Sequence, residues 1–176
     1  MGDITINIDL DSFETDIKKF KAYLDKFEDA IEDAIQEIMG RAELKLMENI
    51  AKYGLGGSEL ASEVSVRRID EYSFELVSGS DYSMFVEFGT GVVGAGNPHP
   101  DPQAGWFYDL GSHGEKGWWY VTDNPYPNQP TWTDPDGNLR AWTRGQPARP
   151  YMYDTYMYIR RIATRTVNKH IRRIAV

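Results

Sequence analysis

Residues 12–53, SFETDIKKFKAYLDKFEDAIEDAIQEIMGRAELKLMENIAKY, decide the fold of this chain. Apolar side chains recur in them at steps of three and four, which is the spacing of one face of an α-helix. No proline interrupts the stretch, and glycines follow it closely. The pattern predicts one helix over 12–53, with Asp11 as its N-cap and a length of roughly 60 Å. Because a compact domain of this size is shorter than that, the helix must project or pack on neighbours. A coiled coil is the alternative for its first half, up to Ile31.

The elements on either side of this helix are shorter. Alternating apolar residues, turn residues and prolines predict, in chain order, a strand at 3–9, an antiparallel hairpin at 63–69 and 72–79 joined through Asp70-Glu71, a short helix at 82–88 capped by Ser80 or Asp81, and a last helix over 150–174. This order predicts the α+β class, with a small antiparallel β-sheet covered by the long N-terminal helix and the C-terminal helix.

Residues 92–148 differ in composition from the rest, because glycine and proline are dense there and all five tryptophans lie in this part. GWWYV at 117–121 predicts a strand, and 131–143 predict a hairpin that turns at Asp136-Gly137. We therefore expect residues 1–176 to form a single domain with a long aromatic-rich β-hairpin insertion at about 92–148. The candidates for contacts between this insertion and a partner are Trp118, Trp119, Trp132 and Trp142.

Charge is divided unevenly along the chain, whose net charge is -8. Residues 1–63 hold 15 acids and 7 bases, residues 64–138 hold 11 acids and 3 bases, and residues 139–176 hold 1 acid and 9 bases. The basic face of the last helix consists of Arg160, Arg161, Arg165, Lys169, Arg172 and Arg173. This face could contact nucleic acid, meet an acidic face of the same or a neighbouring copy, or be solvated.

The composition also excludes several classes of protein. The absence of cysteine excludes disulfides, thiolate metal sites and cysteine nucleophiles, and it is typical of a chain made in the cytoplasm. No apolar run approaches the roughly 20 residues of a membrane span. The N-terminus lacks the pattern of a signal peptide.

Three patterns in the second half have a chemical interpretation. The glycines of 89–96 lack the Gly-Lys-Ser/Thr ending of a phosphate loop, which favours a flexible exit from the short helix. An irregularly spaced set could converge on a metal, namely His99, Asp101, His113 and Glu115. A second set could supply an acid/base pair beside a tryptophan-lined sugar site, namely Glu87 with Asp81, Asp101 or Asp109. No nucleophile elbow is present, and we predict no catalytic residue, metal or cofactor.

The stretch SDYSMFVEFGTG, residues 80–91, resembles the Tyr-Ala-x-Tyr-Val-Glu-Phe-Gly-Thr signature of small neck proteins of lambda-like long-tailed bacteriophages. The match consists of Tyr82, Phe85 in place of tyrosine, Val86, Glu87, Phe88, Gly89, Thr90 and Gly91. A later motif of the family, Arg-Pro-aromatic-Met/Leu, is similar to 149–152, Arg-Pro-Tyr-Met. The family includes head–tail joining, tail-completion and tail-terminator-like minor tail components.

The resemblance implies a structural role without enzymatic activity. Members of the family form rings, here expected as a homo-hexamer, at the joint between head and tail of a siphophage virion. Such a ring caps the tail tube, contacts head-closure or adaptor proteins and tail-tube proteins, and lets genome DNA pass through its lumen without sequence specificity. We expect assembly in the host bacterial cytoplasm and no membrane partner. A tail-associated carbohydrate-binding or carbohydrate-active module that uses the tryptophans is the alternative.

The same resemblance suggests which residues meet a neighbouring subunit. The interface candidates are Tyr82, Phe85, Glu87, Phe88, Arg149 and Tyr151. Tyr82, Phe85 and Phe88 are expected to anchor the short helix. Glu87 is expected to be a polar contact at a subunit joint, with an arginine such as Arg149 as its partner.

Overall fold

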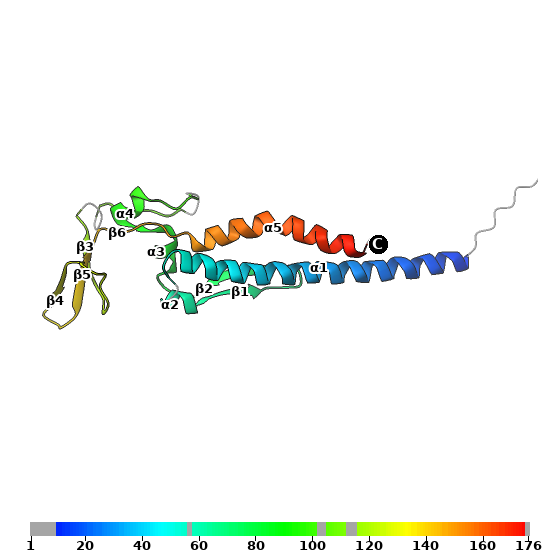
Figure 1. Cartoon of the computed structure of the whole chain (residues 1–176), viewed down its shortest axis with the longest axis horizontal. Coiled ribbons are helices and arrows are strands. Elements are labelled where there is room, and N and C mark those ends of the chain that lie inside the picture. The colour runs from blue at the N-terminus through cyan, green and yellow to red at the C-terminus, as the bar shows by residue number, and fades with distance from the viewer. Residues whose placement is uncertain (1–9, 56–57, 102–104, 112–115, 175–176) are drawn as a thin grey trace, which may run out of the picture.

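The computed structural model describes residues 10–55, 58–101, 105–111 and 116–174. It shows an elongated molecule, in which a helical rod carries a hairpin along its side and a small sheet at one end (Figure 1). The α+β class is confirmed. The predicted strand at 3–9 and the side chain of the predicted cap, Asp11, lie outside the part that is described.

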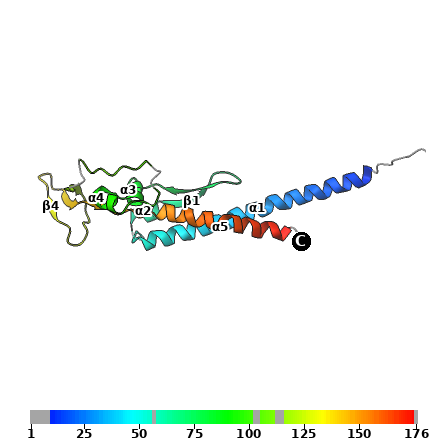
Figure 2. The ribbon, with the colours of Figure 1, turned by 90° about the horizontal axis from the view of Figure 1, so that it is seen from above.

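Two helices, α1 (Leu10–Lys52) and α5 (Tyr151–Ile174), form the rod. They run antiparallel, so that Asn49 near the end of α1 meets Thr155 near the start of α5. Both views show α1 continuing past the end of α5 (Figures 1 and 2). The predicted limits of both helices are confirmed to within two residues, because the spacing of three and four is uninterrupted in α1 and proline is favoured at the start of a helix, where Pro150 lies.

The core lies where the second half of α1 meets α5 and the start of the hairpin. Its buried members are Leu46, Ile50, Leu55, Leu60, Val64, Val86 and Tyr151. Asn49 lies among them with 1% of its surface exposed. Its Nδ2 donates to Thr155 Oγ1 at 2.9 Å, and this bond offsets the cost of burying an amide.

After the short helix α2 (Glu59–Ser62), strands β1 (Val64–Arg68) and β2 (Phe74–Ser78) pair antiparallel along α1. The predicted hairpin is confirmed, but its connection is longer than Asp70-Glu71. Arg68 is the last paired residue of β1, and residues 69–73 form the turn, in which the Asp70 carboxylate accepts the amide of Tyr72 at 2.8 Å. This local bond competes with a tighter turn.

An ion pair fastens the hairpin to α1. The guanidinium of Arg68 donates to both carboxylate oxygens of Glu32. These hydrogen bonds lower the pKa of Glu32 to about 2. The turn end of the hairpin is thus held at the level of Glu32 on α1.

The short helix predicted at 82–88 is confirmed as α3 (Ser83–Phe88). The prediction of its cap was wrong, because Tyr82 occupies the N-cap position without a side-chain cap bond. The flexible glycine exit was also wrong, since Gly91–Gly96 form helix α4. Glycine is needed where the segment around Thr90 meets the segment around Gly145, because the two backbones come close together there. Gly145 has φ +99°, and a side chain on it would collide with the carbonyl of Thr90.

The far end of the molecule is a three-stranded antiparallel sheet in the order β3–β5–β4. Its strands are β3 (Trp118–Val121), β4 (Thr131–Thr133) and β5 (Leu139–Thr143). A further short strand, β6 (Gly145–Gln146), bridges to Thr90 and Gly91 and links this sheet to the body. The insertion thus forms a sheet of three strands rather than one long hairpin.

Candidate assembly surfaces

Glu87 joins α3 to the start of α5. Its carboxylate accepts the backbone amides of Met152 at 3.0 Å and Tyr153 at 2.9 Å. Amides in the first turn of a helix have no partner within the helix, and a negative charge is favoured beside them. Arg149 adds a backbone bond, donating its amide to the carbonyl of Val86 at 2.9 Å. The end of α3 and the start of α5, more than sixty residues apart in sequence, are therefore held together by these hydrogen bonds.

His99 completes the surroundings of the Glu87 carboxylate. Its Nε2 lies 3.2 Å from Glu87 Oε1, and its Nδ1 lies 3.0 Å from the amide nitrogen and 2.9 Å from the carbonyl oxygen of Asp101. Burial raises the pKa of Glu87 above its ordinary value, and the amide and imidazole hydrogen bonds act in the opposite direction. The ring of His99 also packs against those of Phe88 and Tyr153.

These contacts bear on the predicted acid/base and metal sets. The carboxylate of Glu87 is directed to His99 and two amides, and Asp81 is exposed. Of the predicted metal set, His113 and Glu115 lie outside the described residues. Within the residues that the structure describes, no group of three or more acidic or histidine side chains is arranged to hold a metal ion.

The interface candidates divide between two places. Glu87 and Tyr151 point into the chain, with 7% and 0% of their surface exposed. Tyr151 donates its hydroxyl to Ser78 at 3.2 Å. Burial of this degree leaves both side chains little surface for a second copy, and their part in an interface stays a prediction. The guanidinium of Arg149, the predicted partner of Glu87, instead lines a cleft on the surface.

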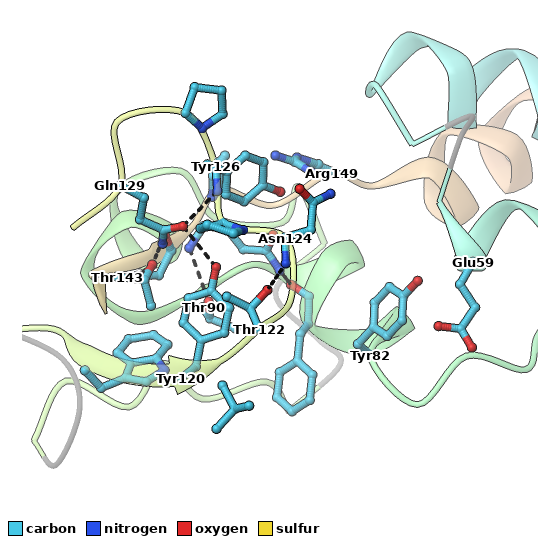
Figure 3. A pocket seen from close by; sticks show the side chains of 18 residues that line it. Glu59, Tyr82, Thr90, Tyr120, Thr122, Asn124, Tyr126, Gln129, Thr143 and Arg149 are labelled. Carbon is cyan, nitrogen blue, oxygen red and sulfur yellow. Dashed lines mark hydrogen bonds between the residues drawn. The ribbon is translucent and has the colours of Figure 1, made fainter. Parts of the chain in front are cut away.

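That cleft lies between α3 and the three-stranded sheet and has a volume of about 1340 Å³. It brings together three interface candidates, Tyr82, Phe85 and Arg149, with Trp118 of the insertion. Figure 3 shows Tyr82 on one side and Tyr120 and Tyr126 on the other. Gln129 fixes the far wall, because its Oε1 accepts from the Tyr126 amide at 3.0 Å and its Nε2 donates to the carbonyl of Trp142 at 2.9 Å.

The tryptophans of the sheet lie on opposite faces. Side chains alternate along a strand, so Trp118 faces the cleft and Trp119 faces away from it. Trp142 is paired opposite Trp119 in the sheet. Trp132 packs edge-on against Trp119, with 6.3 Å between the two ring centroids. Trp119 and Trp132 expose 42% and 44% of their surface, which leaves an aromatic patch at the end of the molecule.

The basic face of α5 is exposed along its length. Its six members are predicted above, and all of them are exposed: Arg160, Arg161, Arg165, Lys169, Arg172 and Arg173. Lys169 pairs with Glu37 of α1 at 2.7 Å. Within the described part of the chain, Arg165, Arg172 and Arg173 make no ion pair. The acidic side of α1 in the same chain therefore neutralises only part of this face.

Sequence reasoning missed two polar contacts that hold the body together. One is the bond from His99 to Glu87, since the histidine was considered only as a metal ligand. The other is the pairing of Asn49 with Thr155. An asparagine in the middle of an apolar helix face is a signal for such a bond, but its partner, 106 residues away, could not be read from the pattern.

No helix among the described residues combines the length and apolar character needed to cross a membrane. Comparison with curated proteins and with solved structures gave no match. Residues 14–89 match the family model described as "Bacteriophage HK97-gp10, putative tail-component". The matched range includes the described part of α1 from residue 14, the hairpin β1–β2 and α3. Over these residues the chain is similar to phage tail components, which supports a phage-tail type of family and a structural role.

Proposed function

We propose that the chain is a structural, non-enzymatic protein of a siphophage virion that forms a ring at the head–tail joint. In this position it caps the tail tube and connects it to the head. Six copies form the ring, its neighbours are head-closure or adaptor proteins and tail-tube proteins, and genome DNA passes through the lumen without base-specific contacts. The ring assembles in the cytoplasm of the host bacterium.

The observation that carries this proposal is the joint between residues 82–89 and 149–153. These residues belong to or adjoin the two motifs that resemble the neck family, 82–91 and 149–152, and the motifs touch through Glu87 and through the amide of Arg149. The resemblance thus rests on residues that position α3 and α5 against one another. The similarity to tail components over residues 14–89 supports the same role.

Charge supports the formation of a ring. The unpaired cations of α5 face outward, and the rest of the chain is acidic. Head-to-tail contacts between unlike faces close into a ring when the rotation between copies permits it. An acidic wall also weakens the binding of DNA that has to move through the lumen.

The test is the mass of the purified chain in solution together with its position in virions. We expect a species of six times the 20.1 kDa of one chain, and a tagged copy at the junction of head and tail in electron micrographs. A monomer at high concentration that is absent from purified virions contradicts the proposal.

The role of the basic face is tested by charge removal. Replacing Arg165 and Arg172 with glutamine should lower the fraction assembled and leave the fold unchanged by circular dichroism. The matched control is Arg67→Gln, an exposed arginine that already pairs with Glu75. If assembly is unaffected while the variant loses a salt-dependent affinity for duplex DNA, the face contacts DNA instead.

A further inference from the structure

The first half of α1 carries an apolar stripe that is exposed from Phe13 to Leu24 and half-buried at Phe27. Its members are Phe13, Ile17, Phe20, Leu24 and Phe27. Phe13 and Phe20 each expose 63% of their surface, and Ile17 exposes 47%. Isolated exposed apolar residues are ordinary, but a contiguous row of large ones along a helix indicates a surface that binds something.

The stripe continues the buried face of the same helix. After Phe27 the steps of three and four lead to Ile31, Ile35, Ile38 and Ala42. Of these, Ile35, Ile38 and Ala42 are buried in the body. One helix face is therefore covered by α5 and the hairpin in its second half and exposed in its first half, where α5 has ended (Figures 1 and 2).

The spacing identifies the kind of partner. From Phe13 to Ile31 the steps alternate strictly as four, three, four, three, four. This is the heptad seam of a coiled coil, and it spans roughly 27 Å. Short isolated helices are marginal because their first turn is costly to form. Here the second half of α1 is already packed, so the projecting half extends an existing helix.

We propose that this stripe packs against the same stripe of one neighbouring copy, in parallel and in register. The proposal rests on the ring proposed above and deepens it: contacts between identical stripes join copies in pairs, and the head-to-tail contacts between unlike faces join the pairs around the axis. It goes further by assigning the segment, its register and its direction.

The charges beside the seam favour this direction. In the parallel register Asp16 of one copy lies beside Lys21 of the next, across the seam. Asp16 also pairs with Lys19 of its own helix at 3.3 Å, and it can be shared because both side chains are exposed. The antiparallel register that would bury the whole seam sets Glu14 opposite Glu28 and Lys21 opposite itself. Like charges in these positions oppose pairing.

Cysteine cross-linking tests the proposal, because the chain has no cysteine of its own. Phe13→Cys and Phe20→Cys are each made in the full chain and treated with a short thiol–thiol linker. Both positions are exposed in the single chain, so the fold is expected to persist, and circular dichroism checks this. In the parallel register each introduced thiol lies beside its own counterpart, and both variants should yield covalent dimers.

The matched control is Ala22→Cys, which lies on the opposite side of the same helical turn and should yield no dimer above background. Equal cross-linking of Ala22→Cys overturns the proposal, since it shows random encounter. Cross-linking of Phe20→Cys without Phe13→Cys overturns the parallel direction. No dimer from either seam variant shows that another partner, or none, covers the stripe.

Mass and virion position are measured in the same samples, so the two proposals can fail separately. Cross-linked copies that are absent from virions leave the pairing intact and remove the neck role. Rings that are present in virions but show no seam cross-links leave the neck role intact and remove the pairing of the stripes.

Discussion

Replacing Glu87 with alanine should destabilise the single chain rather than only the ring. The carboxylate accepts the amides of Met152 and Tyr153, and the Nε2 of His99 lies 3.2 Å from it. Removal leaves these two largely covered amides without this acceptor. Each unpaired buried group costs about 1–3 kcal/mol, and loss of a helix cap costs about 0.5–2 kcal/mol. Part of this cost is recovered if water enters the space, so we expect a loss of about 3–5 kcal/mol.

That loss is a large share of the stability of a domain, which is typically about 5–15 kcal/mol. The assay is urea unfolding followed by far-ultraviolet circular dichroism, at several protein concentrations. A cap within the chain lowers the unfolding midpoint by the same amount at every concentration. If Glu87 acted between subunits, the difference between the midpoints of variant and parent chain would itself change with protein concentration.

The matched control is Asp81→Ala, an exposed acid just before α3. Its midpoint should stay within about 0.5 kcal/mol of the parent chain. The reasoning is refuted if Glu87→Ala keeps the unfolding midpoint of the parent chain and the ring dissociates. Glu87 would then act between subunits.

Three further predictions concern the rod. Asn49→Val should cost about 1–3 kcal/mol because Thr155 loses its donor, and adding Thr155→Val should recover part of this in a double-mutant cycle; a strictly additive result argues against the bond. Leu46→Ala, at a side chain with no exposed surface, should cost about 2–5 kcal/mol, whereas Leu44→Ala, 75% exposed, should change stability by less than about 0.5 kcal/mol. Hydrogen bonds from the Lys169 ammonium and then the His170 imidazole lower the pKa of Glu37 from 4.5 to about 2. The ionised Glu37 therefore adds to the free energy of unfolding above pH 4.5, and this addition is lost as the pH falls toward 2. Glu37→Gln should therefore flatten the fall of stability in that window in acid titration, and an unchanged slope contradicts the assignment.

Regular elements were predictable where the sequence is periodic. The uninterrupted spacing of three and four residues from Phe13 to Ile50 predicted the limits of α1, and Pro150 marked the start of α5. The cap of α3 and the glycine stretch 91–96 were predicted wrongly, because propensity alone does not contain the tertiary contacts that shape them. Gly145 shows the reason: its backbone must approach Thr90, fifty-five residues earlier, and that pairing organises the segment.

The sequence predicted which types of surface the chain carries, but it did not predict which contacts lie within the chain and which lie between subunits. The basic face of the last helix follows from the spacing of its arginines. The motif at 82–91 identified Glu87 as important, but its pattern could not distinguish a contact between subunits from one within the chain. That distinction depends on which segment lies across from α3, and only the folded chain places Met152 and Tyr153 there.

The sequence by itself determined the α+β class, the length of α1 and the division of charge, because helix periodicity and net charge are properties of neighbouring residues. Tertiary structure decided the rest: it buried one half of the α1 stripe against α5 and left the other half exposed, although both halves follow the same pattern. The physical reason is length, since α1 has 43 residues and α5 has 24, so the shorter helix cannot cover the longer one.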